Sequence, residues 1–314
     1  MKKNKNDFKV KFWGVRGSYP VVNKDFLKYG GNTSCVEVTA GNHRIILDGG
    51  TGIIPLGDKL FQEHISSAEN VLDRKPMNIT VLLSHVHQDH IQGLNFFKPM
   101  NIKNTQFSLL GYSGFDTRID ETLSELIYGK SFPINLYDIT ADLNFADITE
   151  TDIIILNDEN DVPTIKRATE GTEIKPEKDE VIISCMKSNS HPNYGVMCYK
   201  ISYKDKNIVF ATDTECYSGG SKKLELFAKD TDLLIHDSQY TTEDYLSTVA
   251  PKQGFGHSTF NMAFETANAA NVKRLAFYHF DPSYNDEKLT TIENIFNKQN
   301  KNYFFAKEGL EICL

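Results

Sequence analysis

The sequence has no long hydrophobic runs and no closely spaced cysteine pairs. No apolar stretch approaches the roughly 20 residues of a membrane-spanning helix, so we expect no membrane partner. No apolar segment follows the basic start of the chain, so we also expect no signal peptide. The cysteines are odd in number, which argues against a disulfide framework or a zinc finger; they are Cys35, Cys185, Cys198, Cys216 and Cys313. These features predict a cytoplasmic protein with reduced thiols.

An excess of positive charge is also lacking. The chain has 34 lysines and arginines against 42 aspartates and glutamates, for a formal net charge of −8. A general nucleic-acid binder needs a basic surface, so this balance argues against one while leaving a specific RNA substrate open.

Hydrophobic residues make up 40% of the 314 residues, which is ample for a packed core. The chain shows no linker, low-complexity tract or internal repeat, so we expect one domain over residues 1–314. Within it, residues 111–150 are expected to be an insertion that caps the functional site or joins two subunits of a homodimer.

The densest group of candidate metal ligands is the stretch Ser84-His85-Val86-His87-Gln88-Asp89-His90, directly after the apolar run Ile79–Leu83. Such a run predicts a buried strand, and His85 and His87, two positions apart, would point to the same side of extended backbone. Scattered polar residues in a loop are the alternative, which four candidate ligands within six positions disfavour. Imidazoles with one carboxylate suit zinc, manganese or iron rather than calcium or magnesium.

Four ligands from one turn cannot all bind a single tetrahedral ion in good geometry. This favours two ions that share the corner, each completed by residues from elsewhere in the chain. Candidates occur downstream: His191 follows a strand-like segment, Asp213 follows Asn207–Phe210, and His279 follows Arg274–Tyr278. All nine histidines except His43 and His64 lie at a strand end or in the loop beyond it.

Other segments have weaker signals. The loop Gly14–Pro20 follows a strand expected over Lys9–Trp13, and its Arg16 and Ser18 are either solvated or form a rim that meets an anionic substrate. Asp48 begins the glycine-rich stretch Asp48-Gly49-Gly50-Thr51-Gly52, which matches no nucleotide-binding spacing. We expect Asp48 to support a histidine of the metal site instead. A helix is predicted over Leu56–Ser66, and another after a cap at Ser258 or Thr259.

The motif His85-x-His87-x-Asp89-His90 resembles the signature of the metallo-β-lactamase superfamily of binuclear metallohydrolases. His191, Asp213 and His279 occur in the order in which that family supplies its remaining ligands, so the resemblance covers nearly the whole chain. It implies an α/β (α+β) fold, a four-layer αββα sandwich. It also implies two divalent transition-metal ions as cofactors, zinc first, with manganese or iron as alternatives.

Within the superfamily, the chain is most similar to the phosphodiesterase branch, which includes ribonuclease Z and the phosphoribosyl cyclic phosphodiesterases. The segment Leu234-Ile235-His236-Asp237-Ser238 stands where ribonuclease Z has His-Glu-Ala-Thr, and Gly256-His257-Ser258-Thr259 resembles its His-Ser-Thr element. Two departures are evident. His191 and Asp213 are too close in sequence to hold the long tRNA-gripping arm of ribonuclease Z, and Asp237 replaces a glutamate.

The resemblance implies a role for each matching residue. One ion would be held by His85, His87 and His191, the other by Asp89, His90 and His279, with Asp213 bridging both. Asp89 would also orient the attacking water, and His257, held by Asp237, would protonate the leaving group. Strand alternation turns His236 away from Asp237, so we expect His236 in the core or in a supporting position.

These roles predict a metal-dependent hydrolase, a phosphodiesterase that acts on a small or cyclic phosphodiester through a metal-bridging hydroxide. Three alternatives stay open at this point. The first is an RNA-processing endonuclease like ribonuclease Z. The second is a di-iron oxygen-binding or redox protein, although such relatives place glutamate where His87 stands. The third is a metal-bearing regulatory module without turnover. The sequence names neither the physiological substrate, the native metal nor the oligomeric state.

Overall fold

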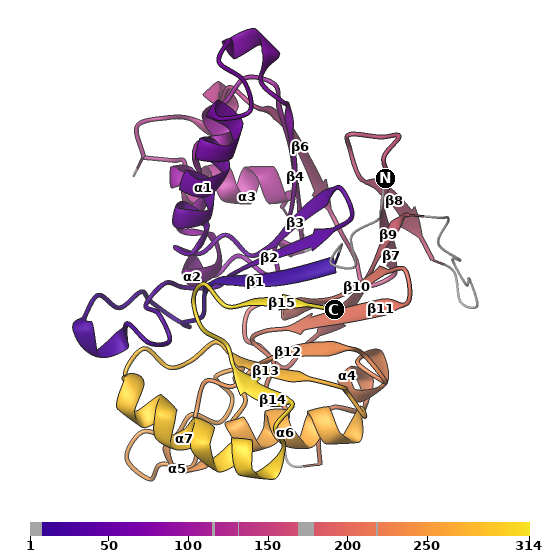
Figure 1. The fold of residues 1–314 in the computed structure, drawn as a ribbon. Helices are drawn as coiled ribbons and strands as arrows, with labels where there is room; N and C mark the ends of the chain where they lie inside the picture. The colour runs from indigo at the N-terminus through magenta and orange to yellow at the C-terminus, as the bar shows by residue number, and fades with distance from the viewer. Residues whose placement is uncertain (1–7, 115–116, 131, 169–178, 218) are drawn as a thin grey trace.

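The computed structural model describes residues 8–114, 117–130, 132–168, 179–217 and 219–314, and its chain forms two packed β-sheets (Figure 1). The first sheet has seven strands in the order β15-β1-β2-β3-β4-β5-β6. They are β1 (Phe8–Gly14), β2 (Cys35–Ala40), β3 (His43–Leu47), β4 (Met77–Leu82), β5 (Thr105–Gly111), β6 (Asp142–Asp147) and β15 (Glu311–Cys313).

The second sheet has eight strands in the order β14-β13-β12-β11-β10-β9-β7-β8. They are β7 (Asp152–Leu156), β8 (Thr164–Arg167), β9 (Val181–Ser188), β10 (Val196–Tyr203), β11 (Lys206–Ala211), β12 (Leu233–Asp237), β13 (Leu275–Tyr278) and β14 (Tyr303–Phe305).

Helices cover the outer face of each sheet (Figure 1). The first sheet carries α1 (Ile53–Ile65), α2 (Gln88–Ile91) and α3 (Ile119–Leu126). The second carries α4 (Lys222–Phe227), α5 (Thr242–Tyr245), α6 (Phe260–Ala269) and α7 (Asp286–Gln299). Single turns of 3₁₀ helix, η1 to η5, lie at Lys24–Phe26, Val71–Asp73, Leu94–Phe96, Lys98–Asn101 and Leu136–Asp138. The layers are therefore αββα, and the predicted fold class is confirmed.

Side-chain alternation along the strands separates two apolar layers. In β3, Ile45 and Leu47 belong to the main core, which continues into the second sheet, whereas Ile46 packs with α1 and α3 in a separate core. Successive strand residues point to opposite faces, so a strand buried on both faces reads as a continuous apolar run. This explains why β4 and β13 were predictable to within two residues at each end.

Two runs of parallel strands determine where the loops meet. Strands β3 to β6 are parallel to one another, as are β11 to β14. The carboxyl ends of parallel strands lie at the same edge of a sheet. The loops after β4, β11, β12 and β13 start there. The backbone N–H of Met197, in β10, donates to the carbonyl of Ser84 at 2.8 Å, and this hydrogen bond joins the two sheets.

The described residues of segment 111–150 are integrated with the first sheet. Strand β6 pairs in parallel with β5, and Ile119, Leu123 and Leu136 lie in the core that α1 shares. Its role as a cap or a subunit contact stays a prediction. In the described part of the chain, no helix is both long and apolar enough to cross a bilayer. The five cysteines are unpaired, as predicted.

Candidate metal centre

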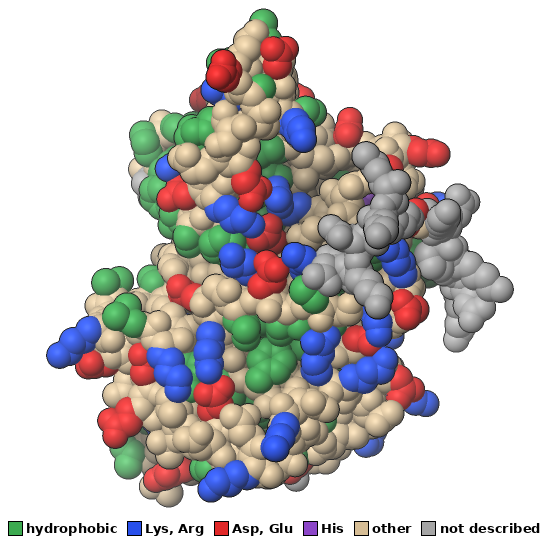
Figure 2. Space-filling view, viewed as in Figure 1, with side chains coloured by type: hydrophobic (Ala, Val, Ile, Leu, Met, Phe, Trp, Pro, Cys, Tyr) green, Lys and Arg blue, Asp and Glu red, His purple; other side chains and the backbone are tan. Residues whose placement is uncertain are grey.

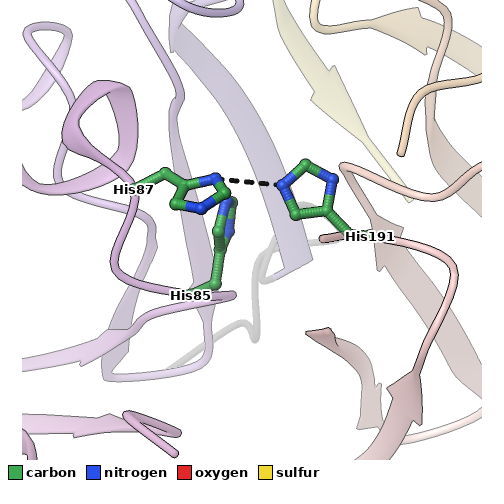
Figure 3. Close-up of side chains that lie close together, drawn as sticks. All are labelled: His85, His87 and His191. Carbon is green, nitrogen blue, oxygen red and sulfur yellow. Dashed lines mark hydrogen bonds between the residues drawn. The ribbon is translucent and has the colours of Figure 1, made fainter. Parts of the chain in front are cut away.

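The loop after β4 brings the first group of imidazoles together. The rings of His85 and His87 are 4.4 Å apart between centroids, and that of His191, from the loop after β9, is 4.8 Å from His85. Figure 3 shows the three side chains converging, with Nδ1 of His87 3.0 Å from Nε2 of His191. His85 and His191 are buried, and His87 is partly exposed. Their ligand atoms are close enough to hold one ion.

A second group lies on the other side of the same corner. Nε2 of His279, from the loop after β13, is 3.2 Å from Nε2 of His90 and 3.2 Å from Oδ2 of Asp89. All three side chains are buried, and their ligand atoms could likewise hold an ion.

Asp213 lies between the two groups. Its Oδ1 is 3.8 Å from Nε2 of His85 and of His191, whereas its Oδ2 is 3.3 Å from Nε2 of His90 and of His279. One carboxylate thus presents a different oxygen to each group, the arrangement expected of a bridging ligand. The structure therefore brings all seven predicted metal-binding residues into one cluster.

The donor set fits a pair of divalent cations. Nε2 of His85 is buried without a hydrogen-bond partner. Two pairs of imidazole nitrogens also face each other within hydrogen-bond distance, although two acceptor nitrogens repel unless a proton or cation lies between them. Nitrogen with carboxylate oxygen is the donor mixture of zinc, manganese and iron sites.

Electrostatics prepare the first group and the bridging carboxylate for a cation. Burial lowers the pKa of His85 well below its usual value, and it also lowers the pKa of His87 and His191, so all three are neutral donors. Burial opposes the charge of Asp213, but His279 and His90 outweigh burial and hold its pKa well below the usual range. Metal ligands must be deprotonated, which the lowered pKa values of these four residues favour. Burial opposes the charge of His90, but the carboxylates of Asp89, Asp213 and Asp48 outweigh burial and raise the pKa of His90 well above its usual value, so a bound ion would have to displace its proton.

Supporting hydrogen bonds orient the histidines. Asp48 Oδ2 lies 2.7 Å from Nδ1 of His90, which confirms the expected supporting contact. Asp48 also accepts hydrogen bonds from the hydroxyls of Ser34 and Ser84, and Ser84 Oγ is 3.0 Å from Nδ1 of His85. The role of Ser84 was missed, because a serine that opens a histidine motif carries no signal of its own. Such contacts set which ring nitrogen faces the ion.

Left-handed backbone recurs in these loops. Asp48, Asp213 and His279 have φ of +63°, +52° and +63°, and Ser18 has +63°. Non-glycine residues adopt this conformation at a cost that the surrounding structure must offset, and such residues cluster at functional sites.

Asp237 and His257 form a buried pair beside the cluster. Oδ2 of Asp237 is 2.7 Å from Nδ1 of His257, and the aspartate also accepts backbone N–H groups of Asp213, Gln239 and Ser258. Burial favours neutral His257, but the Asp237 carboxylate outweighs it and raises the pKa of His257 to about 9. The ring of His257 stacks on His279 at 5.1 Å. The pair therefore holds a protonated imidazole next to the candidate metal ligands.

For Arg16, both interpretations of the first loop, a solvated side chain and a substrate-facing rim, are wrong. It is fully buried, and its guanidinium donates to the carbonyls of Gly30 and Tyr284 at 2.7 Å each, so it is neither solvated nor a substrate-facing rim. Adjacent Gly17 packs against His279, whose ring a Cβ would approach to 2.4 Å. Ser18 is exposed, and its backbone N–H donates to Oδ2 of Asp89 at 2.7 Å. The loop thus supports the cluster through its backbone.

His236 stays outside the cluster, as predicted. It is fully buried, with Nδ1 2.6 Å from its neighbour's carbonyl and Nε2 3.6 Å from Sγ of Cys216. Thr259 is the N-cap of α6 and accepts from the backbone N–H of Met262.

Fold and donor set together define a metallo-β-lactamase-type metal-dependent hydrolase. The family model "Beta-lactamase superfamily domain" matches residues 43–280, and the chain belongs to this superfamily. It is 27% identical to ribonuclease Z of Picrophilus torridus over 97% of this chain and 95% of that protein. Ribonuclease Z of Sulfurisphaera tokodaii is 31% identical over 69% of this chain and 75% of that protein.

Solved structures agree on the fold. The metallo-beta-lactamase fold protein YhfI from Bacillus subtilis matches with a TM-score of 0.63 at 16% identity, over 98% of this chain and 99% of that one. The predicted membership of the phosphodiesterase branch is confirmed by the ribonuclease Z relatives. The ligand and catalytic roles of individual residues are proposals, developed next.

Proposed function

We propose that this protein is a binuclear metal-dependent phosphodiesterase that hydrolyses a small or cyclic phosphodiester. The observation that carries the proposal is the placement of Asp213, whose two oxygens face two separate groups of ligands. One ion would be held by His85, His87 and His191 and the other by Asp89, His90 and His279. Zinc is our first candidate, with manganese and iron as alternatives.

Two bound ions would supply an activated water molecule and neutralise the charge of the phosphoryl oxygens. The chain's own residues place the reacting groups. Asp89 Oδ2 accepts the N–H of Ser18, so the carboxylate is held in one orientation from which it can also orient water. The dipole of that N–H supports the charged form of Asp89.

His257 would be the general acid. Its Nδ1 is engaged by Asp237, which leaves Nε2 as the nitrogen that can deliver a proton to the leaving alkoxide. His257 is 8% exposed, and its ring lies beside those of His191 and His279. Asp237 is fully buried and accepts four hydrogen bonds, so it would hold the imidazole in place and stabilise its cation.

Two features support a small substrate over precursor tRNA. Between His191 and Asp213 the chain forms only a short loop and the hairpin of β10 and β11, with no room for an RNA-gripping arm. On the face shown in Figure 2, basic side chains are interspersed with acidic ones rather than gathered into one patch.

The unpaired cysteines support a reducing, cytoplasmic location.

Ribonuclease Z-like RNA cleavage is the second candidate, because the match to the Picrophilus protein spans almost the full length of both chains. A single comparison separates the two. Purified, metal-analysed protein is assayed on bis(p-nitrophenyl) phosphate, on small cyclic phosphodiesters and on a precursor tRNA. We expect turnover of the small diesters. Cleavage confined to the RNA, with a steep salt dependence, would favour the second candidate. No turnover of any of them would contradict both.

A further inference from the structure

Glu215 is a buried carboxylate that the proposed mechanism does not use. It lies in the loop after β11, two residues beyond Asp213, and is 1% exposed. Its Oε1 accepts from the hydroxyl of Tyr245 at 2.5 Å and from the N–H of Gly254 at 2.8 Å, and its Oε2 accepts from the N–H of Gly256 at 2.9 Å. A charge this deeply buried is costly unless hydrogen bonds satisfy it, and here three donors do so.

Two of the three donors, Gly254 and Gly256, belong to the segment that leads directly into His257, and the third, Tyr245, is the last residue of α5. Gly256 precedes His257 and lies at φ +88°, and a Cβ on it would come within 2.2 Å of Nδ1 of His191. Its carbonyl is 3.2 Å from that same nitrogen. Gly256 thus contacts the Glu215 carboxylate through its N–H and His191 through its carbonyl oxygen, and it is bonded directly to His257 in the sequence.

The backbone of Glu215 extends the same network. Its N–H donates to Oγ of Ser190 at 3.0 Å, next to His191. The residue therefore connects three loops: the one that ends β9, the one that ends β11 and the one that carries His257. Asp237 contacts His257 separately, through Nδ1 of the imidazole.

We infer that Glu215 is a positioning residue that sets the placement of the His257 imidazole through Gly256. The inference rests on the proposed function, in which His257 is the general acid. The three donors need a side chain with two oxygens that both accept hydrogen bonds, and only a carboxylate provides this. Glutamine would keep one acceptor oxygen but turn its NH₂ group toward a backbone N–H, and two facing donors repel. Gly256 and His257 would then shift, and small misplacements of a catalytic group are costly.

The test compares two diaryl phosphate diesters that differ in their leaving groups. Diphenyl phosphate has a poorer leaving group than bis(p-nitrophenyl) phosphate, so its cleavage depends more on a general acid. In Glu215→Gln of equal metal content, we expect kcat on diphenyl phosphate to fall about 10- to 100-fold. The loss on bis(p-nitrophenyl) phosphate should stay below about 3-fold, with KM little changed on both. In a His257→Ala background, Glu215→Gln should cost less than about a further 3-fold, because it acts through the missing imidazole.

Matched variants separate positioning from general loosening. Glu243→Gln makes the same chemical change at an exposed glutamate of α5 and should leave both rates unaltered. Glu215→Asp keeps two acceptor oxygens and should recover part of the loss. If Glu215→Gln does not fold, Glu215→Asp tests the inference in its place, because its smaller loss of kcat should also be confined to diphenyl phosphate.

Three outcomes would overturn parts of this account separately. Wild-type protein that turns over neither diester would overturn the proposed function together with the inference. Equal loss on both diesters in His257→Ala would overturn the acid role and, with it, the role of Glu215. A substrate-selective loss in His257→Ala, combined with an unselective and additive loss in Glu215→Gln, would overturn the inference alone.

Discussion

The two halves of the candidate site are built in different ways. The first sheet contributes four of the seven candidate ligands from one corner, residues 85–90, which comprises the loop after β4 and the start of α2. The second sheet contributes His191, Asp213 and His279 from three loops that are about 20 to 90 residues apart in sequence. The first half is a local motif, whereas the second exists only because strands β9, β11 and β13 end at a common edge.

The supports of the two halves differ accordingly. On the first side, Asp48 and Ser84 bond directly to histidine nitrogens. On the second, buried acids fasten the loops to one another: Asp237 accepts the backbone of Asp213 and Ser258, and Glu215 accepts that of Gly256. The histidines of the first half are already close in sequence, so their imidazole rings need only to be oriented. The loops of the second half must first be held next to one another. The following predictions test that contrast, from the largest effect to the smallest.

Asp213→Ala should have the largest effect, because it removes the carboxylate whose two oxygens face the two groups of histidines. We expect loss of bound metal and a fall in turnover of about 10³-fold or more, since metal ions supply several kcal/mol of transition-state stabilisation. Metal content and kcat on bis(p-nitrophenyl) phosphate measure this. Asp205→Ala, in the exposed β10–β11 turn, is the control and should match the wild type. Full metal content in Asp213→Ala would refute the bridging role.

His257→Ala should separate metal binding from catalysis. The protein should keep its metal, because His257 belongs to neither proposed ligand group, while kcat on diphenyl phosphate falls by roughly 100-fold through loss of the general acid. Elemental analysis and steady-state kinetics on the same preparation check both parts. Loss of metal in this variant would instead make His257 a ligand.

Asp48→Asn should weaken one side of the site. The change removes the carboxylate that bonds Nδ1 of His90 and reduces its support for the imidazole. We expect metal affinity to fall by about 10- to 100-fold, the usual effect of losing such a partner. Competition with a chelator measures it, and unchanged affinity would show that the first half does not depend on Asp48.

Thr259→Ala should have the smallest effect. It removes the N-cap of α6, where the threonine hydroxyl accepts the N–H of Met262. We expect a loss of about 1 kcal/mol in the free energy of unfolding, with unchanged metal content. Chemical denaturation tests the first point and metal analysis the second. A large loss of metal would mean that the second half depends on this cap as well as on Asp237.

Much of the fold and of the metal centre could be predicted from the sequence. Strands β4 and β13 are short apolar runs flanked by polar residues, and the histidines that follow them mark the site by their position. Asp48 was expected as a support because it follows a strand and precedes glycines. Each of these features depends on residues that are close together in the chain, so it can be recognised from a single sequence.

Features that depend on packing were not predictable. Arg16 looked like a surface residue, because arginine seldom becomes fully buried, but here its buried guanidinium donates to the carbonyls of Gly30 and Tyr284. Glu215 shows no periodicity, and its burial follows from three loops meeting around it. The contacts that define both residues span long separations in sequence, which no local pattern encodes.

Metal stoichiometry tests the central claim most directly. Folded, metal-stripped protein is titrated with zinc, and the number of ions bound per chain is measured by calorimetry and by elemental analysis. We predict two ions per chain in the wild type, and one in His191→Ala, which removes a ligand from only one group. Folded wild-type protein that takes up a single ion, or none, would contradict the account.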